Sequence, residues 1–149
     1  MIEFSKSNEV PYGIFSPLFM RSMTFEGVTT PSAEHAFQYG KPKREAVRDW
    51  MLAAPSPSLL AVLSAALPTW EINKGWSRGV YDRMEAITRS KFDQHEDLAR
   101  VLENSSDEPL IYRPQHVSTP NRYSGLIDGD GENALGQILM KIREERRRR

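Results

Sequence analysis

Prolines divide the segment between residues 31 and 68 into short pieces, which limits the kind of fold that the chain can form. A proline fits the first turn of a helix but removes a hydrogen bond from a helix interior. Thr30 and Pro31 suit the cap and first position of one helix, which Gly40 and Pro42 end. Three short helices are therefore predicted, at about 31–40, 44–54 and 57–67, and the last is apolar enough to be expected in the core.

The rest of the chain predicts a few strands and further helices. Alternating apolar and polar residues indicate a strand at 1–4. A strand is also predicted at 109–113, and two strands within 23–29 are predicted to be joined by a turn at Glu26-Gly27. The aromatic segment 12–19 reads as a loop. Helical spacing predicts helices at 77–92, from Asp93 through Leu102, and from about 134 with Leu135, Ile138, Leu139 and Ile142 on one face. This pattern indicates a compact α+β domain dominated by helix, over 1–145, with a basic tail at 146–149.

The amino-acid composition limits the kinds of site and the cellular location that can be expected of the protein. The chain of 149 residues has no cysteine, which excludes disulfides and thiolate metal sites. Its three histidines lack metal-ligand spacing, so no metal is predicted, and no cofactor is predicted either. The longest apolar run, 59–67, is too short to span a bilayer, and the N-terminus does not resemble a signal peptide. We therefore expect a cytoplasmic protein that does not bind a membrane.

The C-terminus is basic although the formal net charge is zero. Residues 141–149 contain six basic and two acidic side chains. Arginines there could complement the negative end of a helix macrodipole, or they could bind nucleic acid. Under the second interpretation, deletion of residues 146–149 should reduce both the affinity for nucleic acid and its salt dependence.

One helix carries a candidate site. Side chains three, four and seven residues apart share a helix face, so Glu34, Phe37, Gln38 and Lys41 form one stripe. Acid, ring, amide and amine together suggest the wall of a binding site. The alternative is that Phe37 is a core residue and the polar side chains surround it at the surface. Because Glu34 lies in the first turn, the macrodipole favours its ionised form, and Lys41 is long enough to reach the same ligand.

Other motifs are compatible with ligand binding but have structural alternatives. The rings of Tyr12 and Phe15 could stack on a flat ligand or pack beneath their own loop. The glycine-rich segment 128–133 could hold a phosphate at the following helix or be a structural turn. It resembles a calcium loop but has Asn133 at the sixth position and Leu139 at the twelfth, so the calcium interpretation fails.

Four elements, in order, resemble signatures of the YbiA-like, or NADAR, superfamily. They are Tyr12-Gly13-x-Phe15-Ser16, the run from Ser32 to Lys41, Lys74-Gly75-Trp76 followed by Met84 and Lys91-Phe92-x-Gln94-His95, and the run from Gly129 through Gly131 and Asn133 to Met140. The resemblance implies the YbiA-like fold and N-glycosidase activity. Family members hydrolyse ribosylated intermediates of riboflavin synthesis, or remove ADP-ribose from modified guanine.

The resemblance also implies roles for individual residues. Glu34 and Lys41 are the predicted catalytic residues, together with Asp128, the carboxylate nearest to the place where the family has an acid before Y-W-G. The predicted substrate-binding residues are Tyr12, Phe15, Ser16, Phe37, Gln38, Trp76, Tyr123, Gly129, Gly131 and Asn133. The chain departs from the family at Pro17, Thr30 and Tyr123, where relatives commonly have asparagine, an aromatic residue and tryptophan.

Two classes of function follow. The first is an N-glycosidase that acts on a ribosylated nucleotide-like substrate, such as ADP-ribosylated DNA or RNA, or on a riboflavin-pathway intermediate. The second is a non-catalytic module that binds ADP-ribose or NAD, an alternative suggested by the acid missing before Tyr123. We expect the hydrolase, with an ADP-ribosylated nucleobase favoured over the riboflavin intermediate, because the three departures indicate a different pocket.

Overall fold

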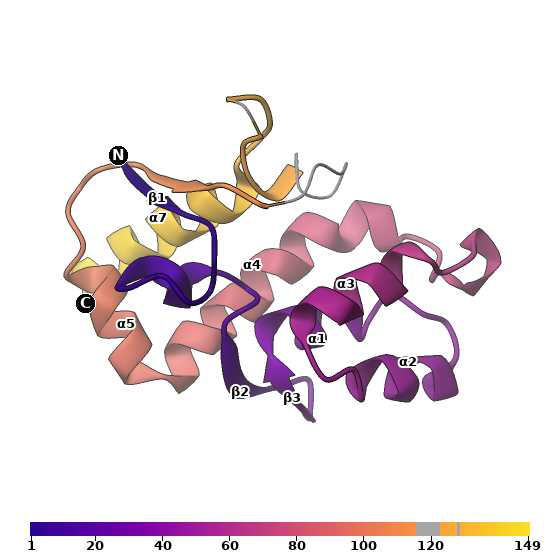
Figure 1. The fold of residues 1–149 in the computed structure, drawn as a ribbon. Coiled ribbons are helices and arrows are strands. Elements are labelled where there is room, and N and C mark those ends of the chain that lie inside the picture. Colours follow the sequence, from indigo (N-terminus) through magenta and orange to yellow (C-terminus); the bar gives the residue numbers. More distant parts are fainter. Residues whose placement is uncertain (116–122, 128) are drawn as a thin grey trace. The chain divides into compact units, whose positions relative to one another are not determined.

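The computed structural model describes residues 1–115, 123–127 and 129–149, and it divides the chain into two compact units (Figure 1). Unit 1 comprises residues 1–19 and 91–149, and unit 2 comprises residues 20–90. The helix α4 (Trp76–Gln94) contributes residues to both units. Helices with a few short strands confirm the predicted helix-dominated α+β class.

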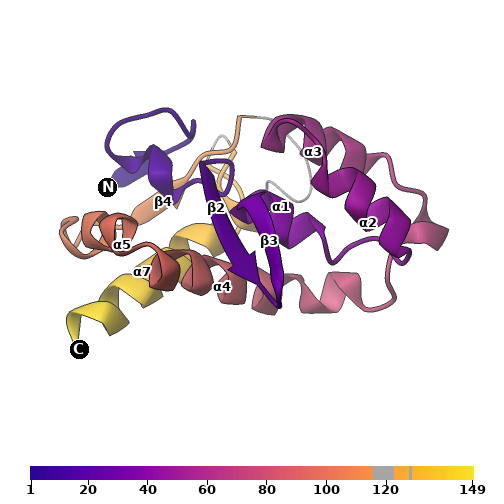
Figure 2. The ribbon, with the colours of Figure 1, turned by 90° about the horizontal axis from the view of Figure 1, so that it is seen from below.

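Unit 2 begins with a β-hairpin. Strands β2 (Met20–Phe25) and β3 (Val28–Ser32) pair antiparallel, with Phe25 opposite Val28. Glu26 and Gly27 connect them with φ angles of 50° and 80°. Two successive positive φ angles are typical of the tight turn that matches the twist of a hairpin, so the turn predicted here is confirmed. Figure 2 shows the hairpin beside α1, which follows it directly in the chain.

Short helices make up the rest of unit 2. They are α1 (Ala33–Gln38), α2 (Glu45–Leu52), α3 (Pro57–Ala65) and the 3-10 turn η2 (Thr69–Glu71). Ser56 caps α3, its Oγ accepting from the backbone N–H of Leu59. One apolar cluster contains Met51, Ala54 and Leu60, and a second contains Met23, Ala33, Ala36 and Ile87.

Helix α3 is less buried than its sequence predicts. Leu60 is buried, but Leu59 and Val62 are 42% and 65% exposed. A helix that packs on one face leaves its other apolar residues at the surface, so the prediction of a core helix was wrong for that face.

Unit 1 is built on a small parallel sheet. Strand β1 (Ile2–Phe4) pairs with β4 (Leu110–Tyr112) (Figure 1). Helices α5 (Glu96–Glu103) and α7 (Ala134–Arg147) complete its regular structure. The predicted apolar face of α7 is confirmed, since its four members are buried: Leu135, Ile138, Leu139 and Ile142.

Several boundaries differ from the sequence-based predictions. Residues Tyr12–Phe15 form a 3-10 turn, η1, within the predicted loop. Helix α4 spans Trp76–Gln94 rather than 77–92. Helix α5 begins at Glu96, with His95 as its N-cap, rather than at Asp93. Among the described residues, no helix is long and apolar enough to cross a membrane.

Asn133 joins α7 to the sheet of unit 1. Its Oδ1 accepts from the backbone N–H of Tyr112 at 3.0 Å, and its Nδ2 donates to the carbonyl of Leu110 at 3.0 Å. Gly136 permits this close approach, because a Cβ there would overlap the Leu110 carbonyl oxygen and the Asn133 amide. Asn133 itself has a positive φ of 50°, a region that asparagine tolerates better than most residues.

Lys91 is a buried cation in unit 1. Its Nζ donates to the carbonyl oxygens of Ile14, at 2.5 Å, and Ser16, at 3.1 Å. The rings of Phe19 and Phe92 also lie near it, with centroids at 5.8 and 5.6 Å. Burial lowers the pKa of Lys91 to about 7, because the ammonium loses its hydration. Lys91 thereby ties the η1 segment to the end of α4.

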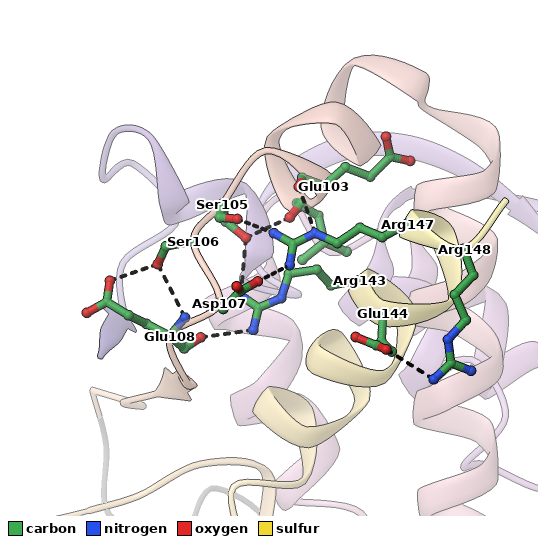
Figure 3. Close-up of polar contacts among 10 residues, drawn as sticks. Glu103, Ser105, Ser106, Asp107, Glu108, Arg143, Glu144, Arg147 and Arg148 are labelled. Carbon is green, nitrogen blue, oxygen red and sulfur yellow. Dashed lines mark hydrogen bonds and ion pairs between the residues drawn. The ribbon is translucent and has the colours of Figure 1, made fainter.

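The C-terminal arginines are bonded within unit 1. Arg146 is 7% exposed, and its guanidinium lies 2.6 Å from Glu103, 3.0 Å from Glu96 and 3.4 Å from Asp93. Arg147 pairs with Asp107 and donates to the carbonyls of Glu103 and Ser105 (Figure 3). Both arginines lie in α7, whereas Arg148 makes an exposed pair with Glu144 at 3.0 Å.

The pH dependence of stability tests the state of Lys91. An unfolded lysine has a pKa of about 10.4, so between about pH 7 and 10.4 the unfolded chain binds a proton that the folded chain does not. Stability therefore falls as pH drops through this window and levels off below it. We expect Lys91→Met to remove this slope, which amounts to a few kcal/mol at about 1.4 kcal/mol per pKa unit.

Urea unfolding at a series of pH values between 6 and 10 measures the slope. Lys6→Met removes an exposed positive charge from the same unit and serves as the control. A Lys91→Met protein with the same slope as the wild type would show that Lys91 is charged throughout.

Two truncations test whether Arg146 and Arg147 stabilise unit 1. Removal of residues 148–149 should change the free energy of unfolding by less than about 0.5 kcal/mol, because exposed pairs contribute little. Removal of residues 146–149 should cost about 1–3 kcal/mol, because it leaves the partners of two guanidiniums unpaired. Thermal melts of both proteins give the comparison, and equal melting temperatures would contradict it.

Candidate active site

Helix α1 is held at its N-terminus by Ser32. The Ser32 Oγ accepts from the backbone N–H of His35 at 3.1 Å. The prediction that Thr30 caps this helix was wrong, because β3 continues through Ser32. Thr30 is instead buried in that strand, and its hydroxyl donates to the carbonyl of Ser32 at 2.9 Å.

Arg83 from α4 holds the other end of α1. Its Nη2 donates to the carbonyl of Ala36 at 2.7 Å, and its Nε donates to the carbonyl of Phe37 at 2.9 Å. These are terminal carbonyls that a helix cannot bond internally. Gly40 leaves room for the guanidinium, since a Cβ there would lie 2.6 Å from Arg83 Cζ.

His35 anchors the buried face of α1. Its Nε2 lies 3.1 Å from the carbonyl oxygen of Ala54, and its Nδ1 lies 2.7 Å from Ser32 Oγ. In the neutral ring, Nε2 donates to the carbonyl, and Nδ1 accepts from the Ser32 hydroxyl. The side chain is 1% exposed. His35 therefore fixes the helix and takes no part in the polar stripe.

The polar stripe of α1 forms one continuous chain of hydrogen bonds. Gln38 Nε2 donates to Glu34 Oε1 at 2.9 Å, and the Ser64 hydroxyl donates to Gln38 Oε1 at 2.6 Å. Lys41 Nζ donates to both the Oγ and the carbonyl oxygen of Ser64, each at 3.0 Å. Glu34, Gln38 and Lys41 are thus brought together through a residue of α3, although α1 ends at Gln38 and Lys41 lies beyond the helix rather than on its face, as the spacing had predicted. Ser64 was missed, because α3 contains serines at positions 58 and 64 and the sequence does not distinguish them.

Burial shifts both ionisable groups of the stripe. It raises the pKa of Glu34, and the hydrogen bond from Gln38 and the charge of Lys41 only partly oppose it. Burial also lowers the pKa of Lys41, against the charge of Glu34. Burial therefore opposes the macrodipole at the N-terminus of α1, which favours an ionised Glu34. The two shifts bring the acid and the amine closer in proton affinity, which suits acid–base chemistry.

Two aromatic rings lie close together in the same unit. The Phe37 and Trp76 centroids are 5.2 Å apart with 59° between the ring planes. Both side chains are half-buried, so each packs on the protein and retains an accessible part. Phe37 is one turn from Glu34 on α1.

The remaining predicted site residues belong to unit 1. Phe15 is 1% exposed and packs against Phe4 and Phe92, which favours the alternative that this ring is structural. The Tyr12 ring stacks on Phe15 at 5.4 Å. Ser16 is buried, and its Oγ accepts from the backbone N–H of Leu18.

The last segment of predicted site residues is described in part. Gly129 and Gly131 are exposed, with positive φ angles of 80° and 140°, and Tyr123 is half-buried. The Asn133 amide is occupied by β4, which supports the interpretation of this segment as a structural turn. Asp128 lies outside the described residues.

A small hollow in unit 2 does not coincide with the stripe. It is lined by Phe25, Glu26, Val28, Thr30, Ala36, Tyr39 and Arg83 and has a volume of about 70 Å³. That is far below the roughly 300 Å³ of a typical ligand pocket. We therefore define the candidate site by the hydrogen-bonded stripe and the two rings. No group of metal-ligating side chains occurs among the residues that the structure describes.

Comparisons with known proteins agree on one family. The model of the NADAR domain family matches residues 3–147. N-glycosidase YbiA of Escherichia coli strain K12 is 28% identical over 134 residues, which cover 90% of this chain and 81% of that protein. The NMR structure of E. coli YbiA matches with a TM-score of 0.80 at 28% identity, covering 97% of this chain and 83% of that one. The fold seen here is therefore that of YbiA.

A longer relative has a different name. A riboflavin biosynthesis protein of Vibrio vulnificus is 30% identical over 134 residues, covering 90% of this chain but only 35% of that protein. An N-glycosidase of Nostoc punctiforme is 28% identical over 138 residues, covering 91% of this chain and 86% of that protein.

Substitution of Trp76 tests its assignment to the site. Trp76→Ala should weaken the binding of ADP-ribose by about 1–3 kcal/mol, the usual contribution of a stacked ring, while the protein stays folded. Calorimetric titration and a thermal melt measure the two effects.

Trp70→Ala removes a ring that is 67% exposed in the same unit and should leave binding unchanged. If Trp76→Ala instead destabilised the fold by about 3–5 kcal/mol with normal binding of ADP-ribose, Trp76 would be a core residue.

Proposed function

The chain belongs to the NADAR domain family, and from that premise we propose that it is an N-glycosidase that hydrolyses a ribosyl–nitrogen bond. The observation that carries the proposal is the hydrogen-bonded chain that joins Glu34 and Lys41 through Gln38 and Ser64. It supplies an acid and an amine whose pKa values are shifted toward each other. The names of the relatives support the same reaction class.

We propose an ADP-ribosylated nucleobase, such as modified guanine, as the preferred substrate. The tilted rings of Phe37 and Trp76 offer stacking surface for a base, and Lys41 offers a cation for the ribose or its phosphates. The Vibrio relative supports the second candidate, a ribosylated intermediate of riboflavin synthesis. The departures at Pro17 and Tyr123 favour the first. The departure at Thr30 no longer bears on this choice, because that side chain is buried in β3.

Cleavage of the bond from C1 to the base nitrogen leaves positive charge on the sugar. An ionised Glu34 can stabilise that charge while water attacks C1. In a second route, a neutral Lys41 amine bonds to C1 as the base leaves with the electron pair, and a protonated Glu34 gives the base its proton. Ring opening then yields an imine, which water hydrolyses to release the sugar and restore the amine. Burial of both groups favours the second route, because it increases the share of the neutral forms.

A non-catalytic module that binds ADP-ribose or NAD is the competing proposal. The observation in its favour is that Pro120 to Gly125 lacks the acid that the family places before Y-W-G. Incubation of the protein with ADP-ribosylated DNA, and separately with the riboflavin intermediate, followed by mass spectrometry of the products, separates the two functions. A binding module would protect its ligand and release no product.

Substitutions of the two charged residues test the catalytic assignment. Glu34→Gln keeps the shape and a hydrogen-bond acceptor for Gln38 but has no proton to exchange, so turnover should fall by about 10²–10⁴. Lys41→Ala should have at least as large an effect. The Glu34→Gln protein should still fold and bind ADP-ribose.

Lys43→Ala is the matched control, because this lysine is exposed two residues beyond Lys41. Borohydride should trap a substrate adduct on the wild type and on the control but not on Lys41→Ala. Turnover by Glu34→Gln near the wild-type rate would exclude Glu34 as a catalytic residue. If no adduct is trapped, the direct attack of water is the operating route.

A further inference from the structure

The hydrogen bonds between Lys41 and Glu34 all point in one direction. The ammonium of Lys41 can only donate, so the Ser64 oxygen accepts from it. The single hydroxyl hydrogen of Ser64 must then go to Gln38 Oε1. This contact turns the amide nitrogen of Gln38 toward Glu34, which accepts. The charge on Lys41 thus determines which group of the Gln38 amide faces the carboxylate, which lies three hydrogen bonds away.

From this geometry we infer that Ser64 is a positioning residue that couples the protonation states of Lys41 and Glu34 through the Gln38 amide. The inference rests on the proposed function, because it assigns a task to the chain of residues between the two catalytic groups. Ser64 would not touch the substrate. It acts by setting the direction of the bonds on either side of it.

The same atoms can form a second, reversed set of hydrogen bonds. A neutral Lys41 amine has a lone pair, so the Ser64 hydroxyl can donate to it and accept from the Gln38 nitrogen. The Gln38 carbonyl oxygen then faces Glu34, which can complete the set only if it is protonated. One proton has left Nζ and one has arrived on the carboxylate, so the total is unchanged.

Mixed states are less favourable than these two. With a charged Lys41 and a protonated Glu34, or with a neutral Lys41 and an ionised Glu34, the first set of hydrogen bonds can still form, but only one of its two ends is strengthened by a charge. Water does not readily make up the difference, because Ser64 is 3% exposed. The chain therefore favours the ion pair or the fully neutral pair.

The neutral pair is the form that the covalent route requires. It provides an amine that can bond to C1 and a carboxylic acid that can protonate the leaving base at the same time. Burial disfavours charge on both residues, which brings the neutral pair within reach. The charges of Glu34 and Lys41 also act on each other: the charge of Lys41 opposes the rise in the pKa of Glu34, and the charge of Glu34 opposes the fall in the pKa of Lys41.

Helix α3 places Ser64 independently of its hydroxyl. The carbonyl oxygen of Ser64 accepts from Lys41 and from the backbone at the end of α3. Alanine at this position keeps the helix and that carbonyl bond. Ser64→Ala therefore removes the relay while leaving Lys41 one anchor.

The coupling can be measured without any substrate. NMR titration of the Lys41 side chain, assigned with Lys41→Arg, gives its pKa in four proteins: wild type, Glu34→Gln, Ser64→Ala and the double variant. We expect Glu34→Gln to lower the pKa of Lys41 in the wild type, and to lower it by less than half as much when Ser64 is alanine. Equal shifts in both backgrounds would overturn the inference, because the coupling would then be purely electrostatic through space.

Kinetics provide the second readout. Ser64→Ala should reduce kcat at least tenfold with little change in KM. Both the acid and the alkaline limb of its pH–rate profile should be shifted relative to those of the wild type. Ser64→Thr retains a hydroxyl and should restore most of the rate. Ser58→Ala, an exposed serine of the same helix, should behave as the wild type.

The titration and the kinetics still test the inference if one variant does not fold or if the proposed function is wrong. Gln38→Met breaks the same relay at its next member, so it replaces Ser64→Ala in both measurements if that protein does not fold. If the wild type turns over neither substrate, the proposed function fails, whereas the titration still tests the coupling. A wild-type rate in Ser64→Ala would refute the positioning role even where the titrations of Lys41 and Glu34 are linked.

Discussion

The position of the candidate site depends on hydrogen bonds at the two ends of a helix that is too short to be stable alone. Helix α1 has six residues, and isolated helices shorter than about 12 are marginal in water. Ser32 bonds its first turn, Arg83 bonds its last carbonyls, and His35 ties it to Ala54 in the segment after α2. Glu34 and Gln38 therefore hold their places because of residues outside the polar stripe. A substitution at any of these supports would disturb chemistry that it does not touch.

Much of the fold could be predicted because local rules decide it. The turn at Glu26-Gly27 follows from backbone conformations that only a few residues tolerate, and the start of α3 follows from a serine before a proline. The buried face of α7 follows from helical spacing. The shared face of Glu34 and Gln38 on α1 could also be predicted from helical spacing.

Contacts between distant segments could not be predicted in this way. Ser64 and Arg83 contact α1 and its polar stripe from other helices, and the residues next to them in the sequence do not indicate that role. The cap of α1 was misplaced because Thr30 and Ser32 both carry hydroxyls, and only the pairing of β3 decides between them. The raised pKa of Glu34 could not be predicted, because burial is a property of the folded chain, whereas the macrodipole is a property of one helix.

The Asn133 side chain has a further consequence for how the protein behaves at high concentration. Its amide presents one acceptor and one donor to β4, as a residue of a neighbouring strand would. Because β1 already occupies the other side, the amide caps the outer edge of a two-stranded sheet. Open strand edges recruit strands from other molecules and seed aggregates. The Asn133 amide and the backbone N–H of Leu126, which donates to the Tyr112 carbonyl at 2.8 Å, therefore leave that side of β4 with little for a strand of another molecule to pair with.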